Sequence, residues 1–208
     1  MTYNVKLFGA VESTQDIAHE MIRDGSARDR TIIAAERQTK GRGRGGHAWV
    51  SEPGNLYSTF IFESAPSPAD AYIFAIAVTE AIRDLGIHTE IKWSNDVLVR
   101  GNKISGILIE YLDGFLIAGI GVNIKHSPDN VSYPTTNLAA HGVDMDAEKL
   151  MHRLIKRIDF WRDENFDTIR KRWMELALKD KGYVGIHDDG GLILQTDNGL
   201  ELVYSVGR

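Results

Sequence analysis

Runs of hydrophobic residues along the chain predict a protein that mixes strands with helices. Short runs rich in β-branched and aromatic residues, bounded by glycine or polar turn residues, predict strands. Such runs cover residues 5–8, 31–36, 55–62, 90–99 with a polar turn at 94–96, 101–110 and 115–124. Residues 106–110 and 115–124 are almost continuously apolar and flank Asp113-Gly114, which predicts a hairpin at the centre of a sheet buried on both faces.

Apolar residues at helical spacing predict helices between and after these strands. The first is expected to begin at Ser13, with Asp16 three residues on as the partner in a capping box. A second follows Ser67-Pro68 and reaches Gly86, and it is apolar around most of its circumference, so it should lie against the sheet. Two more begin near residues 144 and 165, and we interpret their aromatic residues as core.

The tail changes from helical to strand periodicity. Residues 183–186, 192–195 and 200–204 predict three short strands with turns between them. We therefore expect a main domain over residues 1–179 and a small β domain over residues 180–208.

Composition and charge exclude several classes of protein. With 24 Lys and Arg against 29 Asp and Glu, the net charge is −5, so no general basic field attracts nucleic acid. The chain has no cysteine, which excludes disulfides and thiol chemistry. No signal sequence opens it, and no apolar run reaches the ~18 residues that span a bilayer. We expect a cytoplasmic protein without a membrane partner.

A glycine-arginine segment follows the strand at 31–36. Residues 41–46 read Gly-Arg-Gly-Arg-Gly-Gly, and Trp49 follows. Glycines let the backbone approach a ligand closely, and arginines supply fixed cationic donors for a phosphate or carboxylate. The segment joins two strands and lacks the lysine-serine or lysine-threonine ending of a P-loop, so the Walker and dinucleotide motifs are excluded. Alone, it fits an anion-binding loop and a mobile basic surface loop equally well.

A second polar cluster lies between the next strands. Asp96 could hold a divalent cation seven residues before Lys103, which could face a phosphate, and this pair suits a site that uses ATP. Alternatively, Asn95 and Asp96 form only a turn, and Lys103 is a lysine that protects an edge strand from aggregation. Asn123 is the one polar residue in its apolar run, and an adenine edge is a candidate partner for it.

Several segments occur together and in order, and their combination resembles the biotin protein ligase family over roughly residues 10 to 125. They are Ser13-Thr14, Gln38 with the Gly-Arg segment 41–46 and Trp49, Lys92-Trp93-Ser94-Asn95-Asp96, Lys103 with residues 106–110, and residues 119–123. The resemblance implies an α/β (α+β) fold with a mixed central sheet flanked by helices, as in class II aminoacyl-tRNA synthetases and lipoate ligases. A small SH3-like C-terminal β domain is expected to follow.

The resemblance also implies a reaction in two steps. Biotin and ATP form biotinyl-5′-adenylate, and a lysine of a biotin carboxyl carrier protein or domain then attacks the mixed anhydride. Two anions must meet in the first step, so Lys103 and Arg44, aided by Mg²⁺, are the expected catalytic residues. Trp49 at the end of the glycine-arginine segment indicates a loop that closes over the adenylate.

The same resemblance assigns contacts residue by residue. Biotin is expected to contact Ser13, Thr14, Gln38, Gly41, Arg42, Arg44, Lys103, Gly106 and Gly119. ATP and the adenylate are expected to contact Arg42, Gly43, Arg44, Trp49, Asn95, Lys103 and Asn123. Mg²⁺ is expected near Asn95 and Asp96, directly or through water.

Two positions depart from the family pattern. Serine stands at position 94, where the family more often has proline, and this could loosen the turn that places Asp96. The amide of Gln15 could hydrogen-bond a small polar ligand, but glutamine stands where the family usually has asparagine, so the resemblance does not support this role. The ligase pattern starts near residue 5, which implies the monofunctional type without a DNA-binding domain. A homodimer is among the expected states.

Two other functions remain open from the residues. A lipoate ligase shares the layout, although the glycine-arginine segment with Lys92-Trp93-Ser94-Asn95-Asp96 favours biotin. An RNA-binding module could also use an Arg-Gly segment. A single such segment on an acidic chain, without repeats or paired stacking aromatics, argues against RNA.

Overall fold

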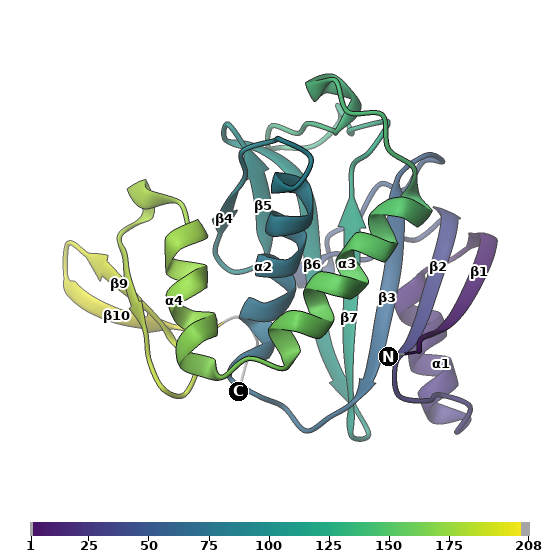
Figure 1. Cartoon of the computed structure of the whole chain (residues 1–208), viewed down its shortest axis with the longest axis horizontal. Coiled ribbons are helices and arrows are strands. Elements are labelled where there is room, and N and C mark those ends of the chain that lie inside the picture. Colours follow the sequence, from purple (N-terminus) through teal and green to yellow (C-terminus); the bar gives the residue numbers. More distant parts are fainter. Residues whose placement is uncertain (1, 205–208) are drawn as a thin grey trace.

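A computed structural model describes residues 2–204 of the chain (Figure 1). The helices and strands of the first half are β1 (Asn4–Val11), α1 (Thr14–Arg23), β2 (Thr31–Gln38), the 3₁₀ turn η1 (Arg44–Gly46), β3 (Leu56–Glu63), α2 (Asp70–Arg83), β4 (Glu90–Lys92) and β5 (Asp96–Val99). The second half contains β6 (Asn102–Leu112), β7 (Phe115–Val122), η2 (Ala139–His141), α3 (Ala147–Arg162), α4 (Phe166–Leu176), η3 (Lys179–Lys181), β8 (Tyr183–Ile186), β9 (Leu192–Thr196) and β10 (Gly199–Val203).

One mixed sheet forms the centre of the molecule, in the order β1-β2-β3-β7-β6-β5-β4. β1 and β2 are parallel because α1 carries the chain back between them, and the other neighbours are antiparallel. Asp113 (φ 47°) and Gly114 (φ 84°) make the tight turn between β6 and β7. The predicted hairpin is therefore confirmed, and it lies in the interior of the sheet. The predicted burial on both faces is wrong, because buried and partly exposed residues alternate over residues 118–122 of β7 and most of β6 is only partly buried.

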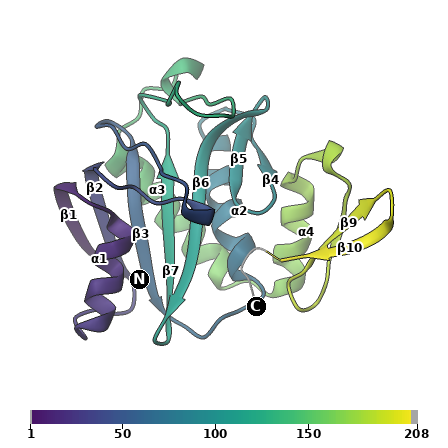
Figure 2. The same ribbon diagram turned by 180° about the vertical axis from the view of Figure 1, so that it is seen from behind.

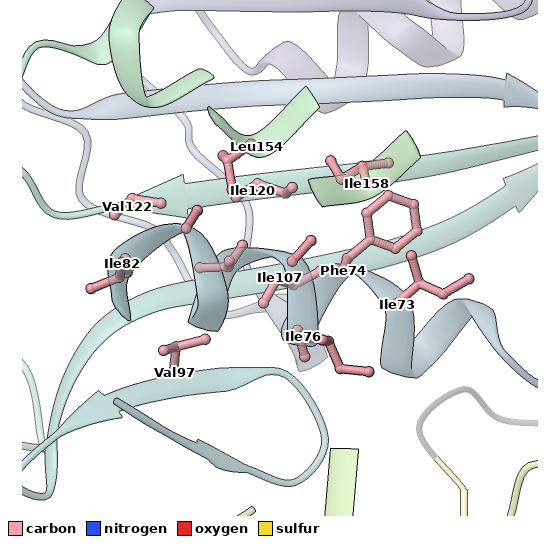
Figure 3. Close-up of a cluster of buried hydrophobic side chains, with 14 of the residues drawn as sticks. Ile73, Phe74, Ile76, Ile82, Val97, Ile107, Ile120, Val122, Leu154 and Ile158 are labelled. Carbon is pink, nitrogen blue, oxygen red and sulfur yellow. The ribbon is translucent and has the colours of Figure 1, made fainter. Parts of the chain in front are cut away.

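One face of the sheet packs against α2 and α3. Figure 3 shows side chains of α2, such as Phe74 and Ile76, meeting Ile107 of β6 and Ile120 of β7, with Leu154 coming from α3. As predicted, α2 is buried around most of its circumference. It begins at Asp70, whose carboxylate accepts a hydrogen bond of 2.8 Å from the Ser67 backbone N–H.

The opposite face is covered only in part. Ala18, Met21 and Ile22 of α1 pack on Ile33, Ile61 and Ile117 of β2, β3 and β7. Further along, the same face carries Thr59, Gly119, Gly121, Gly106 and Glu110, because side chains alternate along each strand. Small and polar residues leave a hollow there. The loop that contains η1 passes in front of this part of the sheet (Figure 2).

The predicted tail strands are confirmed as a small antiparallel sheet of β8, β9 and β10. Aromatic rings join it to the main sheet: Trp173 lies 5.6 Å from both Tyr72 and Tyr183, and 5.8 Å from Trp93, between ring centroids. The SH3-like character of the tail and a boundary after residue 179 stay predictions. Residues 1 and 205–208 of the two predicted domains lie outside the described residues.

Two local predictions were wrong, and one alternative interpretation is excluded. Asp16 does not complete a capping box with Ser13, because the Ser13 hydroxyl accepts from the Gln15 N–H and the Asp16 carboxylate pairs with Arg42. The first strand does not end at Gly9 but continues to Val11, because Ala10 and Val11 pair with the end of β2. Lys103 does not protect a sheet edge, since β6 lies between β5 and β7. Among the helices of residues 2–204, none has the length and apolar character needed to cross a lipid bilayer.

Candidate active site

A cavity of about 280 Å³ opens on the hollow face of the sheet, beneath the loop that joins β2 to β3. We call it the central cavity, and we call residues 39–50 the glycine-arginine loop. Its lining combines the start of α1, that loop, the β4–β5 turn, and strands β3, β6 and β7. Most of the residues predicted for the site line it: Ser13, Thr14, Gln38, Arg42, Gly43, Arg44, Trp49, Asn95, Asp96, Lys103, Gly106 and Gly119.

The end of the cavity next to α1 is polar and uncharged. The backbone N–H and the hydroxyl of Thr14 donate to Gln38 Oε1 over 2.9 and 3.1 Å. Gln38 Nε2 donates to Ser51 Oγ over 2.9 Å, so both ends of this amide are oriented. Ser13 is buried and caps α1 by accepting from the Gln15 N–H. This end therefore offers fixed neutral donors and acceptors.

Gln15 and Gly119 form the floor of this neutral end. Thr59 Oγ1 lies 2.9 Å from Thr14 Oγ1 and 3.1 Å from Gln15 Oε1. A Cβ at Gly119 would lie 2.6 Å from Gln15 Oε1, a distance that forces a shift. A side chain at position 119 would therefore displace the Gln15 amide from its present place.

The glycine-arginine loop folds back on itself above the cavity. Trp49 N–H donates to the Gly41 carbonyl, and Gly43 N–H donates to the His47 carbonyl, each over 2.8 Å. A Cβ at Gly41 would lie 2.4 Å from the Trp49 carbonyl oxygen, so the neck of the loop requires glycine. Gly41 lines an outer cavity of about 730 Å³ beside the loop and is absent from the lining of the central cavity.

Arg42 anchors this loop to the body of the protein. Its Nη1 donates to Asp16 Oδ1 over 2.6 Å and its Nη2 donates to Glu110 Oε1 over 2.7 Å. Two carboxylates thus already engage the guanidinium group. A contact between Arg42 and a substrate anion stays a prediction.

Arg44 comes from the same loop and reaches the β4–β5 turn. It donates to Ser94 Oγ and, over 3.0 Å, to Asn95 Oδ1. The Asn95 amide donates in turn to the Ile107 carbonyl of β6. Serine at position 94, the departure from the family pattern, therefore contributes a hydroxyl that contacts Arg44.

Lys103 lies at the cationic end of the cavity, and three groups hold it. Its Nζ is 2.7 Å from Asp96 Oδ1, and it lies 5.3 Å and 5.0 Å from the ring centroids of Trp49 and Tyr133. The Trp49 indole rests on Gly106 and Gly121, which pair with each other across β6 and β7. The ammonium group is therefore placed before any substrate arrives.

Buried polar atoms lie beside this cationic end. Within residues 2–204, Trp49 Nε1 and Asn123 Oδ1 have no hydrogen-bond partner. Asn123 Nδ2 donates to the Thr136 carbonyl over 3.0 Å. Asn123 lines a small adjoining cavity together with Trp49 and Lys103, outside the central cavity. Because buried polar atoms are normally paired, these two are candidates to bind a polar ligand.

The wall between the two ends contains Tyr57. Burial raises the pKa of its phenol to about 12, and the hydroxyl donates to the Glu52 carbonyl over 2.7 Å. The side chain therefore stays neutral near pH 7 and adds no charge to the cavity.

The metal prediction rests on Asp96. Among residues 2–204, no group of three or more His, Cys, Asp or Glu side chains is placed to hold a metal ion. Asp96 lines the central cavity and has one oxygen paired with Lys103. A single carboxylate suits Mg²⁺ that is also held by nucleotide phosphates, since Mg²⁺ commonly binds in this way.

Comparison with known proteins shows which protein family the chain is similar to. Residues 7–126 match the model of the biotin/lipoate A/B protein ligase family. The chain is 32% identical to the bifunctional ligase/repressor BirA of Bacillus subtilis (strain 168), over 94% of this chain and 70% of that protein. The chain belongs to this family.

A further ligase sequence and a solved ligase structure are also similar to the chain. The biotin–[acetyl-CoA-carboxylase] ligase of Paracoccus denitrificans is 28% identical, over 82% of this chain and 86% of that protein. The structure of the biotin protein ligase from Aquifex aeolicus in complex with biotin and ATP superposes with a TM-score of 0.84 and 27% identity. That match covers 97% of this chain and 96% of the other, and it confirms the predicted fold class.

Some residues of this ligase-type site were missed by the sequence reasoning. Glu110, Thr59 and Tyr133 each contact a predicted site residue, namely Arg42, Thr14 and Lys103. Glu110 is the only acid in β6, and an acid inside an apolar strand was a usable signal. Thr59 and Tyr133 carried no such signal, because their places depend on strand register and on the loop after β7.

Proposed function

We propose that the chain is an ATP-dependent biotin protein ligase, which forms biotinyl-5′-adenylate from biotin and ATP and transfers biotin to a lysine of a carrier domain. The observation that carries this proposal is the division of one cavity into a neutral end at Thr14 and Gln38 and a cationic end at Arg44 and Lys103. Biotin has matching ends, a neutral ureido ring and a carboxylate. Family members named above include biotin ligases, one of them solved with biotin and ATP.

The neutral end selects the ring. Ser13, Thr14 and Gln38 offer hydroxyl and amide groups to the ureido carbonyl and N–H groups of biotin. The dithiolane ring of lipoate has no N–H or carbonyl and would leave these polar groups without partners. An unpaired buried polar group costs about 1–3 kcal/mol, so the cavity favours biotin over lipoate.

The cationic end promotes adenylation. A carboxylate oxygen of biotin attacks the α-phosphorus of ATP, and the bond from that phosphorus to the pyrophosphate oxygen breaks. Arg44 and Lys103 offset the repulsion between the two anions and stabilise the charge that develops on phosphate oxygens. Trp49 and Asn123 offer their unpartnered polar atoms to the adenine ring.

Asp96 and Asn95 would hold Mg²⁺, directly or through water, together with phosphate groups of ATP. The ion would supply further neutralisation of phosphate charge. Both residues lie at the β4–β5 turn that also meets Arg44, so the metal and the arginine would act on the same end of the substrate.

The second step transfers the acyl group. The acceptor lysine attacks the acyl carbon of the anhydride, the bond to the phosphate oxygen breaks, and AMP leaves. Until then the glycine-arginine loop shields the anhydride from water. We propose a biotin carboxyl carrier domain as the acceptor, with no role for nucleic acid. The homodimer and the cytoplasmic location stay predictions.

The proposal is tested by incubating the protein with biotin, Mg-ATP and a biotin carboxyl carrier domain, and by measuring the carrier's mass. We expect one added biotinyl group on one lysine, dependent on ATP. The control carrier has that lysine replaced by arginine and should gain no mass. An unchanged mass of the intact carrier would contradict the proposal.

A further inference from the structure

We propose that Glu110 is a positioning residue that holds the glycine-arginine loop over the central cavity and orients the amide of Gln15. The inference deepens the proposed function, and its kinetic consequences rest on that function. Its structural part concerns the unliganded protein and is tested separately.

Glu110 joins three parts of the protein that are distant in sequence. Its Oε1 accepts from Arg42 of the loop over 2.7 Å. Its Oε2 accepts from Gln15 over 2.9 Å and from His19 over 3.0 Å, both on α1. Both oxygens of a side chain that is only 24% exposed are therefore used to connect the loop, α1 and β6.

The orientation of Gln15 follows from this contact. A carboxylate only accepts hydrogen bonds, so Gln15 must turn its Nε2 toward Glu110. Its Oε1 then points to Thr59 and lies above Gly119 on the cavity floor. Gln15 is buried and lines the central cavity, so it presents an acceptor to a ligand N–H, such as that of the ureido ring.

The same network reaches both ends of the loop. The Thr59 hydroxyl contacts Thr14, which donates to Gln38 at the end of β2. Gln38 donates to Ser51, whose hydroxyl donates to the Trp49 carbonyl over 2.9 Å. The two ends of the loop and Arg42 within it thus belong to one network of hydrogen bonds. Glu110 connects Arg42 to Gln15 in that network.

Asp16 provides a matched control. It accepts from Arg42 over 2.6 Å, as Glu110 does, but no hydrogen bond connects it to Gln15 within the described residues. It is also more exposed, at 44% of its side chain. Asp16→Asn therefore removes one anchor of Arg42 and leaves the Gln15 amide oriented, whereas Glu110→Gln removes an anchor and the orientation together.

The structural arm measures hydrogen–deuterium exchange of the unliganded loop in the parent, Glu110→Gln and Asp16→Asn. Charged hydrogen bonds contribute more than neutral ones, so Glu110→Gln should speed exchange at the Gly43 and Trp49 amides about tenfold. Asp16→Asn should speed it less than about threefold, because the exposed pair is weaker. Loop exchange in Glu110→Gln at the parent rate would overturn the proposal, and this readout needs no catalytic activity.

The kinetic arm measures adenylate formation and the release of labelled biotinyl-adenylate from the full chain. Glu110→Gln should raise KM for biotin and the release rate about tenfold each, with kcat for adenylation within about twofold of the parent. Asp16→Asn should raise the release rate alone. A fall in kcat with unchanged KM would contradict a positioning role.

Further measurements separate the remaining outcomes. If Glu110→Gln does not fold, Gln15→Met tests the orientation alone: KM for biotin should rise while loop exchange stays at the parent rate. An unchanged KM in Gln15→Met would remove the ligand contact from the proposal. Should the parent show no biotin-dependent use of ATP, the proposed function fails, and loop exchange in the Asp16 and Glu110 variants still decides whether Glu110 holds the loop.

Discussion

Replacing Lys103 by methionine is expected to slow adenylation by about 10²–10³-fold while the fold stays intact. Methionine keeps an unbranched stem between the Trp49 and Tyr133 rings, which the lysine ammonium approaches at 5.3 and 5.0 Å. It removes the ammonium group, with its positive charge and its N–H donors. The variant therefore separates the chemistry of Lys103 from its packing.

The magnitude follows from the position of the ammonium group. The Lys103 side chain is 16% exposed and lines the central cavity, where a fixed donor toward developing charge contributes about 2.7–4 kcal/mol to the barrier reduction. The substitution also breaks the pair with Asp96, whose side chain is 28% exposed. A partly exposed pair contributes about 1 kcal/mol or less, so stability should change far less than activity.

The assay is single-turnover formation of biotinyl-adenylate by rapid quench, together with urea denaturation of the same samples. Lys149→Met is the matched control, because Lys149 also forms an ion pair, of 2.8 Å with Asp146, but lies exposed on α3. It should form the adenylate at the parent rate. Adenylate formation by Lys103→Met at that rate would refute the catalytic assignment.

Three further substitutions, one of them with a matched control, test the roles of Arg44, Trp49 and Asp70. Arg44→Gly should release adenylate early, seen as biotin on bystander lysines; the absence of such labelling would contradict a retaining role. Gly121→Ala places a Cβ 2.5 Å from the Trp49 indole, which must then move by about 1 Å, so KM for ATP should rise about tenfold. A Cβ added at Gly9 would have no atom within 4 Å, so Gly9→Ala is the control. Equal KM values for ATP in the two variants would count against a contact between Trp49 and ATP. Burial raises the pKa of Asp70, so its contribution to stability is present at low pH and is lost as pH rises through the folded-state pKa. Urea denaturation should therefore show the parent losing stability relative to Asp70→Asn as the pH rises above the ordinary aspartate pKa of about 3.9, and parallel pH profiles would refute this.

Much of the fold could be predicted because its signals are local. Asp113-Gly114 lies between two apolar runs, and Ser67-Pro68 precedes a long apolar helix, so each element carries its own start or turn signal. The end of β1 was missed because that strand is continued by its pairing with β2, and Gly9 by itself favours a break. Lys103 was open to an edge-strand interpretation for a similar reason, since strand order is not a local property.

The candidate site was predictable as a set of residues but not as a set of contacts. The partners of Arg42, Asp16 and Glu110, are 26 and 68 positions away, and they meet it only after α1 docks on β3 and β7. Gly106 was expected at the site, yet the flat surface that it forms with Gly121 beneath Trp49 depends on the direct pairing of these two glycines. Geometry of this kind is set by register, which the residue types alone do not specify.

The most direct test of the account is biotin-dependent exchange of labelled pyrophosphate into ATP by the parent protein with Mg²⁺. We expect rapid exchange with biotin and none above background with lipoate, because the neutral end of the cavity offers hydrogen-bond partners to a ring with N–H and carbonyl groups. Exchange supported by lipoate, or by neither acid, would contradict the account.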